Sequence, residues 1–74
     1  MEELIAAIIA LAVKDYAIAF QRYVRFPNRQ EYIRECEELE AFFRSRWFET
    51  LSNMDGEVII KKTREYVKKR EAKV

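Results

Sequence analysis

The sequence predicts an all-α fold, a small protein of three helices at about residues 2–26, 28–48 and 53–71. Apolar residues recur at spacings of three and four along most of the chain, the pattern of one face of a helix. Only one glycine and one proline occur in 74 residues, too few for a turn-rich β protein. Half of the residues are hydrophobic and 36% are charged, a balance that argues against disorder.

The length predicts a single domain, residues 1–74. A chain of this size buries only about 60% of the surface that its unfolded form exposes, so it needs a further source of stability. The single cysteine, Cys36, permits no internal disulfide, and the absence of histidine removes the usual zinc ligand sets. We therefore expect no metal or cofactor, and we expect stability to come from tight helix packing or from self-association.

The first predicted helix, residues 2–26, has a continuous apolar face. Its N-terminal half, LIAAIIALAV at residues 4–13, is hydrophobic nearly all round, which is unusual for a surface helix of a monomer. Either this half lies in the centre of the core, or it meets a second copy of the chain. We expect a homo-oligomer that associates through this helix, with an interface of Leu4, Ile5, Ile8, Ile9, Leu11 and Val13.

The apolar run at residues 4–13 is about half as long as the roughly twenty residues that cross a bilayer. The chain opens with the acidic pair Glu2 and Glu3, whereas a secretory signal opens with basic residues. We therefore expect a cytoplasmic protein that keeps its N-terminus and does not associate with a membrane.

The second predicted helix follows Pro27, which cannot continue a helix and moves Phe26 out of the α region. Asn28 stands three residues before Glu31, a capping-box pattern that predicts the start of the helix at residue 28. Cys36 is expected to be a small core residue and not an exposed nucleophile. The predicted core stripe of this helix comprises Tyr32, Cys36, Leu39, Phe43 and Trp47.

The stretch FFRSRWF, residues 42–48, holds four aromatic residues around two arginines. On a continuous helix three of the aromatic residues lie on or beside the core stripe, whereas Phe48 points away from it. This predicts either that the helix kinks or stops between Ser45 and Trp47, or that two partners enclose Phe48. Aromatic and arginine side chains dominate interface energies. The predicted partner-binding residues are therefore Arg44, Arg46, Trp47 and Phe48.

The third predicted helix follows SNMDGE, residues 52–57, which holds the only glycine and is expected to form a turn. Either Ser52, or Asp55 with Glu57 behind it, is expected to cap this helix. The remaining surface of the helix is rich in lysine and arginine. Its predicted apolar stripe comprises Val58, Ile59, Tyr66 and Val67, with Ile60 to one side.

Catalysis is not expected, and no catalytic residues are predicted. The serines and Cys36 have no histidine to activate them, and the acids of residues 31–40 are dispersed along a solvated helix face. A calcium loop is also excluded, because aligning Gly56 with its invariant glycine places Leu51 and Lys62 at the first and last ligand positions.

The net charge of +1 hides a strong segregation of charge. Residues 57–74 carry seven basic and three acidic side chains, a net charge of +4, whereas residues 30–40 carry five acids and one arginine, a net charge of −4. The acidic and basic helices either attract one another, or the basic helix binds an anion, a nucleotide or DNA. The candidate anion-binding residues are Arg22, Arg25, Arg29, Lys61, Lys62, Arg64 and Lys68.

The segment KDYAIAF, followed by CEELEAFFRSRWFETLSNMDGEVIIKK, resembles short uncharacterised proteins carried by phages and prophages of Gram-positive bacteria. The resemblance covers most of the chain and contains no catalytic motif. It implies a phage accessory protein, and such proteins often act stoichiometrically as binders. The leading interpretation is therefore a small non-enzymatic inhibitor that occludes a host or defence protein. The alternative is the binding of an anion, a nucleotide or DNA.

Overall fold

The computed structural model describes residues 2–72 and contains four helices. They are α1 (Glu2–Arg25), α2 (Gln30–Arg44), α3 (Arg46–Leu51) and α4 (Gly56–Ala72). The ends of the predicted domain, residues 1, 73 and 74, lie outside the described residues. The all-α class is thus confirmed, whereas the prediction of three helices is wrong because the second helix is divided in two.

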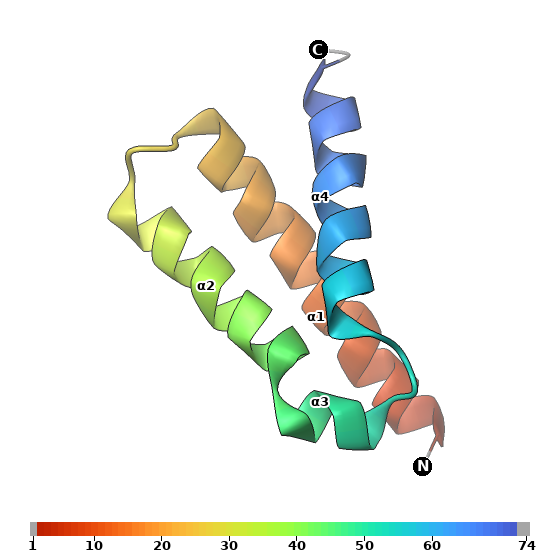
Figure 1. Cartoon of the computed structure of the whole chain (residues 1–74). Coiled ribbons are helices and arrows are strands. Elements are labelled where there is room, and N and C mark those ends of the chain that lie inside the picture. The colour runs from red at the N-terminus through yellow and green to blue at the C-terminus, as the bar shows by residue number, and fades with distance from the viewer. Residues whose placement is uncertain (1, 73–74) are drawn as a thin grey trace.

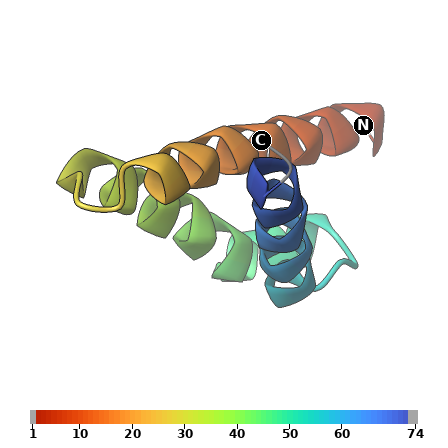
Figure 2. The same cartoon turned by 90° about the horizontal axis from the view of Figure 1, so that it is seen from above.

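The long helix α1 packs against α2 and α4, and α3 packs against α2. Helix α2 returns beside α1 in the opposite direction, and α4 crosses α1 further along, so that α2 and α4 diverge above α3 (Figure 1). Seen from above, α2, α3 and α4 all lie on one side of α1, and the N-terminal end of α1 extends past them (Figure 2). Within residues 2–72, no helix therefore packs against the opposite side of α1.

The turn between α1 and α2 explains why the predicted capping box is wrong. Pro27 and Asn28 form this turn, which closes with the Arg29 N–H donating to the Phe26 carbonyl (3.2 Å). Arg29 is the residue that precedes α2, and its side chain makes no capping hydrogen bond. Asn28 belongs to the turn, and Arg29 takes the capping position in its place.

Ser45 ends α2 and begins α3. Its backbone is extended (φ −73°, ψ 155°), its hydroxyl donates to the Phe42 carbonyl (2.6 Å), and the same hydroxyl accepts from the Phe48 N–H (3.2 Å). Serine is a preferred residue at the start of a helix because its side chain satisfies one of the unpaired N–H groups there. The predicted break between Ser45 and Trp47 is confirmed.

The break at Ser45 reverses the expected positions of Trp47 and Phe48. Phe48 is fully buried, whereas Trp47 is 55% exposed and packs its ring against Phe42, with 5.5 Å between the ring centroids. On a continuous helix Trp47 would face the core and Phe48 would face away from it. The extended backbone at Ser45 changes the direction of the side chains that follow, so that Phe48 faces the core instead. Trp47 is therefore not a core residue, and the expectation of an exposed Phe48 is wrong.

Helix α4 begins against the end of α2. Asp55 caps it, since its Oδ1 accepts from the Glu57 N–H (3.0 Å), which confirms the second of the two predicted caps. A Cβ atom added at Gly56 would collide with the carbonyl oxygen of Phe43 and would lie 2.8 Å from the carbonyl carbon of that residue. Only glycine allows the two backbones to approach this closely. Gly56 was expected in a turn, and this contact was not predicted.

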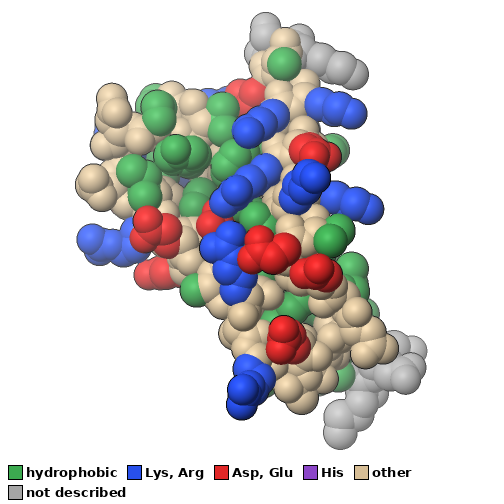
Figure 3. Space-filling view, viewed as in Figure 1, with side chains coloured by type: hydrophobic (Ala, Val, Ile, Leu, Met, Phe, Trp, Pro, Cys, Tyr) green, Lys and Arg blue, Asp and Glu red, His purple; other side chains and the backbone are tan. Residues whose placement is uncertain are grey.

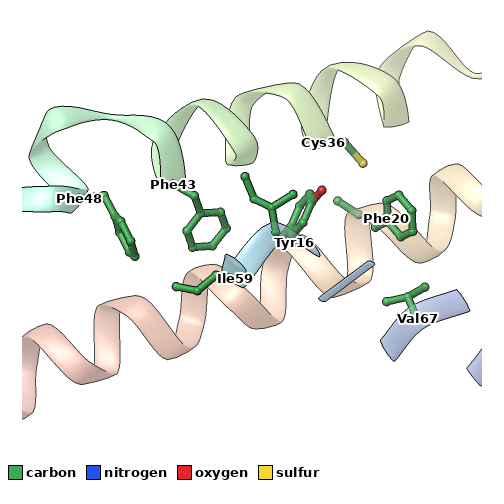
Figure 4. Packing of buried hydrophobic residues seen from close by; sticks show 9 residues of the cluster. Tyr16, Phe20, Cys36, Phe43, Phe48, Ile59 and Val67 are labelled. Atoms are coloured by element: carbon green, nitrogen blue, oxygen red, sulfur yellow. The ribbon is translucent and has the colours of Figure 1, made fainter. Parts of the chain in front are cut away.

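The core lies where α1, α2, α3 and α4 converge, and it is rich in aromatic rings (Figure 4). The Phe43 ring packs edge-on against Phe48 at 5.5 Å and against Tyr16 at 5.9 Å, a favourable geometry for aromatic pairs. From α4, the predicted stripe is only partly right, because Val58 and Tyr66 are exposed. The buried core residues are Tyr16, Ala19, Phe20, Cys36, Phe43, Phe48, Ile59, Ile60 and Val67.

Phe48→Ala is expected to lower the free energy of unfolding by about 3–5 kcal/mol, because it leaves a cavity beside Phe43. Trp47→Ala is expected to lower it by about 1 kcal/mol, since that ring is largely solvated. Urea denaturation followed by circular dichroism measures both changes. Equal losses, or a larger loss for Trp47→Ala, would contradict the placement of these two rings.

Gly56→Ala is expected to lower the free energy of unfolding by about 3 kcal/mol, because the added methyl group collides with the backbone of Phe43 and separates α4 from α2. The higher helix propensity of alanine offsets at most about 1 kcal/mol of this loss. Asn53→Ala, in the exposed loop before α4, is the matched control and should change stability little. A Gly56→Ala protein as stable as the wild type would refute the close approach.

Candidate functional site

A polar network joins the three long helices at the centre of the molecule. The Tyr16 hydroxyl of α1 donates to Oε2 of Glu40 on α2 (2.6 Å). Arg64 of α4 donates from Nε to the Tyr16 hydroxyl (2.9 Å) and from Nη2 to Glu40 Oε2 (2.6 Å). The Arg64 guanidinium also lies 5.9 Å from the centroid of the Phe20 ring, within range of a cation–π contact. Each helix thus contributes one member.

Burial and charge together set the protonation of this network. Burial alone would raise the pKa of Glu40, but hydrogen bonds from Tyr16 and Arg64 outweigh it and lower the pKa below its usual value. Burial, together with the hydrogen bond to Glu40, raises the pKa of Tyr16. Hydrogen bonds to Glu40 and Tyr16 raise the pKa of Arg64. At neutral pH the network is therefore an ionised Glu40–Arg64 pair with a neutral tyrosine.

Attraction between the acidic and the basic helix, one of the two alternatives that the charge segregation predicts, occurs at the Glu40–Arg64 pair. Tyr16, the third member, was not predicted. The available signal was a tyrosine on the core face of a helix, because a buried hydroxyl needs a hydrogen-bond partner. Across the described residues, no buried side-chain nitrogen or oxygen lacks such a partner.

A groove of about 490 Å³ opens where α2 and α4 diverge. Its floor is the apolar face of α1, with Phe20, Tyr23 and Val24, and its charged walls include Glu37 from α2 and Lys68 from α4. The space-filling view shows hydrophobic side chains in this gap and basic side chains along α4 (Figure 3). The groove is open to solvent, so it offers a surface and not an enclosed catalytic cavity.

Cys36 lines the same groove but is buried, as predicted. Burial, assisted by the charges of Glu40 and Glu35, raises the pKa of its thiol to about 11. The thiol is therefore protonated at neutral pH, and a protonated thiol is a poor nucleophile. Among residues 2–72, no group of three His, Cys, Asp or Glu side chains is placed to hold a metal ion.

The arginines predicted to bind anions near the α1–α2 turn each contact a carboxylate. Arg22 lies 3.9 Å from Glu35, and Arg25 lies 3.2 Å from Glu71. Arg29 lies 3.6 Å from Glu31.

The predicted basic residues of α4 lie in two environments. Arg64 belongs to the central network, whereas Lys61, Lys62 and Lys68 are exposed. An anion at the α1–α2 turn would compete with acids already in place, while the lysines of α4 face solvent.

The four predicted partner-binding residues are also divided. Arg44 contacts Glu57 of α4 and lies 3.6 Å from Glu40. Arg46 and Trp47 are exposed on α3, whereas Phe48 is buried and is not available to a partner.

The residues of the predicted oligomer interface lie on two different faces of α1. Ile5, Ile9 and Val13 are half-buried, and the last two pack against the core. Leu4 and Leu11 are 64% and 60% exposed, and Ile8 is also exposed. The structure thus leaves one apolar row of α1 uncovered, which we call the α1 outer row. It comprises Leu4, Ile8, Leu11 and Ile18.

The composition of α1 also bears on the expectation that the chain does not associate with a membrane. By length and composition alone, Leu4–Arg25 is long and apolar enough to cross a bilayer, and only 17% of its apolar window is buried within the protein. A core helix of a soluble protein, which is mostly buried, and a signal sequence near the N-terminus pass the same test, so length and composition alone do not identify a membrane span. Within this segment Tyr16 is buried and hydrogen-bonded to Glu40, so one face of the helix belongs to the protein core.

Comparisons of the chain with protein-family models, with curated proteins and with solved structures gave no match in any of the three. The resemblance to phage and prophage proteins therefore stays a prediction.

Glu40→Gln is expected to lower the free energy of unfolding by about 1–2 kcal/mol at pH 7, since Arg64 loses its counter-ion while the acceptor oxygen remains. Because the pKa of Glu40 is lowered in the folded state, its contribution is present above the unfolded pKa and is lost as the pH falls through the folded pKa. The difference between wild type and variant should therefore shrink from pH 7 to about pH 3.

Urea denaturation at a series of pH values measures this difference. Glu38→Gln is the matched control, because Glu38 is an exposed acid on the same helix. A difference that stays constant with pH, or that is as large for Glu38→Gln, would exclude the electrostatic role of Glu40.

Proposed function

We propose that this protein is a non-enzymatic binding protein that acts stoichiometrically by covering a surface of another protein. The observation that carries the proposal is the α1 outer row, defined above. Leu4 and Leu11 are mostly exposed on a helix whose opposite face forms the core. Burying a leucine side chain contributes about 1.5–3 kcal/mol, so covering this row would favour association strongly.

The exposed end of α3 supports a second contact region. Trp47 and Arg46 are neighbours on this short helix and both are exposed. Tryptophan and arginine are enriched among the residues that dominate interface energies. In this proposal the occluded target is a host or defence protein, in keeping with the resemblance to phage accessory proteins. The outer row also serves self-association when no target is bound.

The alternative function, binding of a polyanion, is supported by a different observation. Lys61, Lys62 and Lys68 are exposed on α4, and their side chains are available to phosphate groups. Arg64 is less available to a phosphate group than these lysines, since it donates hydrogen bonds to Glu40 and Tyr16. Binding by these lysines would weaken steeply with salt, whereas binding through the outer row would not.

The double substitution Leu4→Ser and Leu11→Ser is expected to abolish association through α1, because it removes the two most exposed leucines of the outer row. Each lost contact is worth about 1.5–3 kcal/mol, or roughly tenfold or more in affinity. Sedimentation velocity measures self-association, and quantitative capture from a bacterial lysate at low and moderate salt measures binding to other proteins.

Val58→Ser is the matched control, because Val58 is an exposed aliphatic residue on α4. It should leave both readouts unchanged. A wild-type protein that sediments as a monomer and retains no protein in a fixed ratio would refute the proposed function. Association that collapses at moderate salt and is insensitive to the leucine substitutions would favour the polyanion alternative.

A further inference from the structure

A second groove, the α1–α4 groove, lies on the opposite flank of α4 from the gap between α2 and α4. It has a volume of about 550 Å³. Its floor comes from the middle of α1, where Ala10, Val13 and Ala17 are small apolar residues. Ile18 of α1 and Tyr66 of α4 add exposed apolar surface to it. The small floor residues let another helix approach closely, since the distance between packed helices depends on the side chains at the contact.

The charge of this groove has a single sign. The charged side chains that line it are Lys14, Lys62 and Arg70, all of them basic. Arg70 Nη1 donates to the Tyr66 hydroxyl (3.3 Å), which holds the cation beside the apolar surface. Within the range the structure describes, no carboxylate lies within ion-pair distance of these three residues. The groove thus presents apolar surface bordered by basic side chains that form no direct ion pair.

The acid at the end of the groove is already engaged. Glu71 accepts from Gln21 (2.8 Å) and pairs with Arg25 (3.2 Å). It therefore belongs to the contact between the ends of α1 and α4, and its charge also interacts with that of Arg70, whereas Lys14 and Lys62 form no ion pair with it.

The shape and the charge together select the occupant. An enclosed pocket buries most of a small ligand, whereas this groove is an open channel between two crossing helices, and an amphipathic helix can lay its apolar face into such a groove. A second copy of this chain is a poor occupant. Residues 4–13 of α1 are apolar but carry no acid, and the acidic outward residues of α2, such as Glu31 and Glu38, have no apolar stripe beside them.

We propose that the α1–α4 groove binds an acidic amphipathic helix of the target protein. Apolar residues of that helix pack on Ala10, Ala17 and Tyr66, while its carboxylates face Lys62 and Arg70. The proposal rests on the proposed function and names the kind of segment that is recognised. The groove adjoins the first half of α1, so a docked helix can continue along α1 toward the outer row.

The probe is a synthetic helical peptide with leucines at spacings of three and four and glutamates on both flanks of that stripe. Fluorescence anisotropy measures its affinity, and amide chemical shifts locate it on the protein. We expect shift changes at Ala10, Ala17 and Tyr66. The substitutions Lys62→Glu and Arg70→Glu should each weaken binding about tenfold or more, because an attractive charge becomes a repulsive one.

Lys61→Glu and Lys68→Glu are matched controls with the same charge change on the other flank of α4, and they should alter the affinity less than about twofold. Equal effects of all four substitutions would overturn the proposal and indicate general attraction to acids. It would also be overturned if the peptide with lysines in place of the glutamates bound as well, or if the shifts mapped to the α2–α4 gap. Target capture that depends on Leu4 and Leu11, without peptide binding, would leave the proposed function standing and reject only the acidic helix.

Discussion

The arrangement of the helices depends on the hydrogen-bonded site shared by Tyr16, Glu40 and Arg64. These residues come from α1, α2 and α4, and the two charged members are partly removed from water. Sliding any helix would leave an ionised or hydroxyl group without its partner, and an unpaired buried group costs more than the bond itself contributes. In a chain too short for a large apolar core, this network favours one register of the three helices over shifted ones.

Two local features bring the remaining elements to this centre. The extended backbone at Ser45 turns α3 so that Phe48 meets Phe43, and the missing side chain of Gly56 lets α4 start against the carbonyl of Phe43. From that contact Ile60 reaches the core. Further along, α4 crosses α1 and diverges from α2, and a groove opens on each of its flanks. The close contact of α4 with α2 at Gly56 and the two grooves beside α4 thus both result from the way in which α4 is placed against α1 and α2.

The same geometry makes the molecule asymmetric in a way that bears on function. All other helices lie on one side of α1 (Figure 2), so the helix buries Tyr16 and Phe20 but leaves Leu4 and Leu11 in water. The basic groove between α1 and α4 lies next to this apolar surface. The open groove and the uncovered apolar row are the features on which the proposed binding role rests. The members of the central polar network are hydrogen-bonded to one another and join the three long helices.

The order of residues along the chain was enough to establish the helical class, the stop before Pro27 and the burial of Cys36, and it named Asp55 as one of two candidate caps. These features depend on neighbouring residues and on helical periodicity, which act within a few positions of the chain. The burial of Phe48 and the exposure of Trp47 were settled by packing, because the direction of the chain after Ser45 depends on what α3 packs against. The network joins positions 24 and 48 residues apart, and the contact of Gly56 with Phe43 joins two different helices. Periodicity places a residue on a face of its own helix, but the partner of that face is set by the packing of the whole chain.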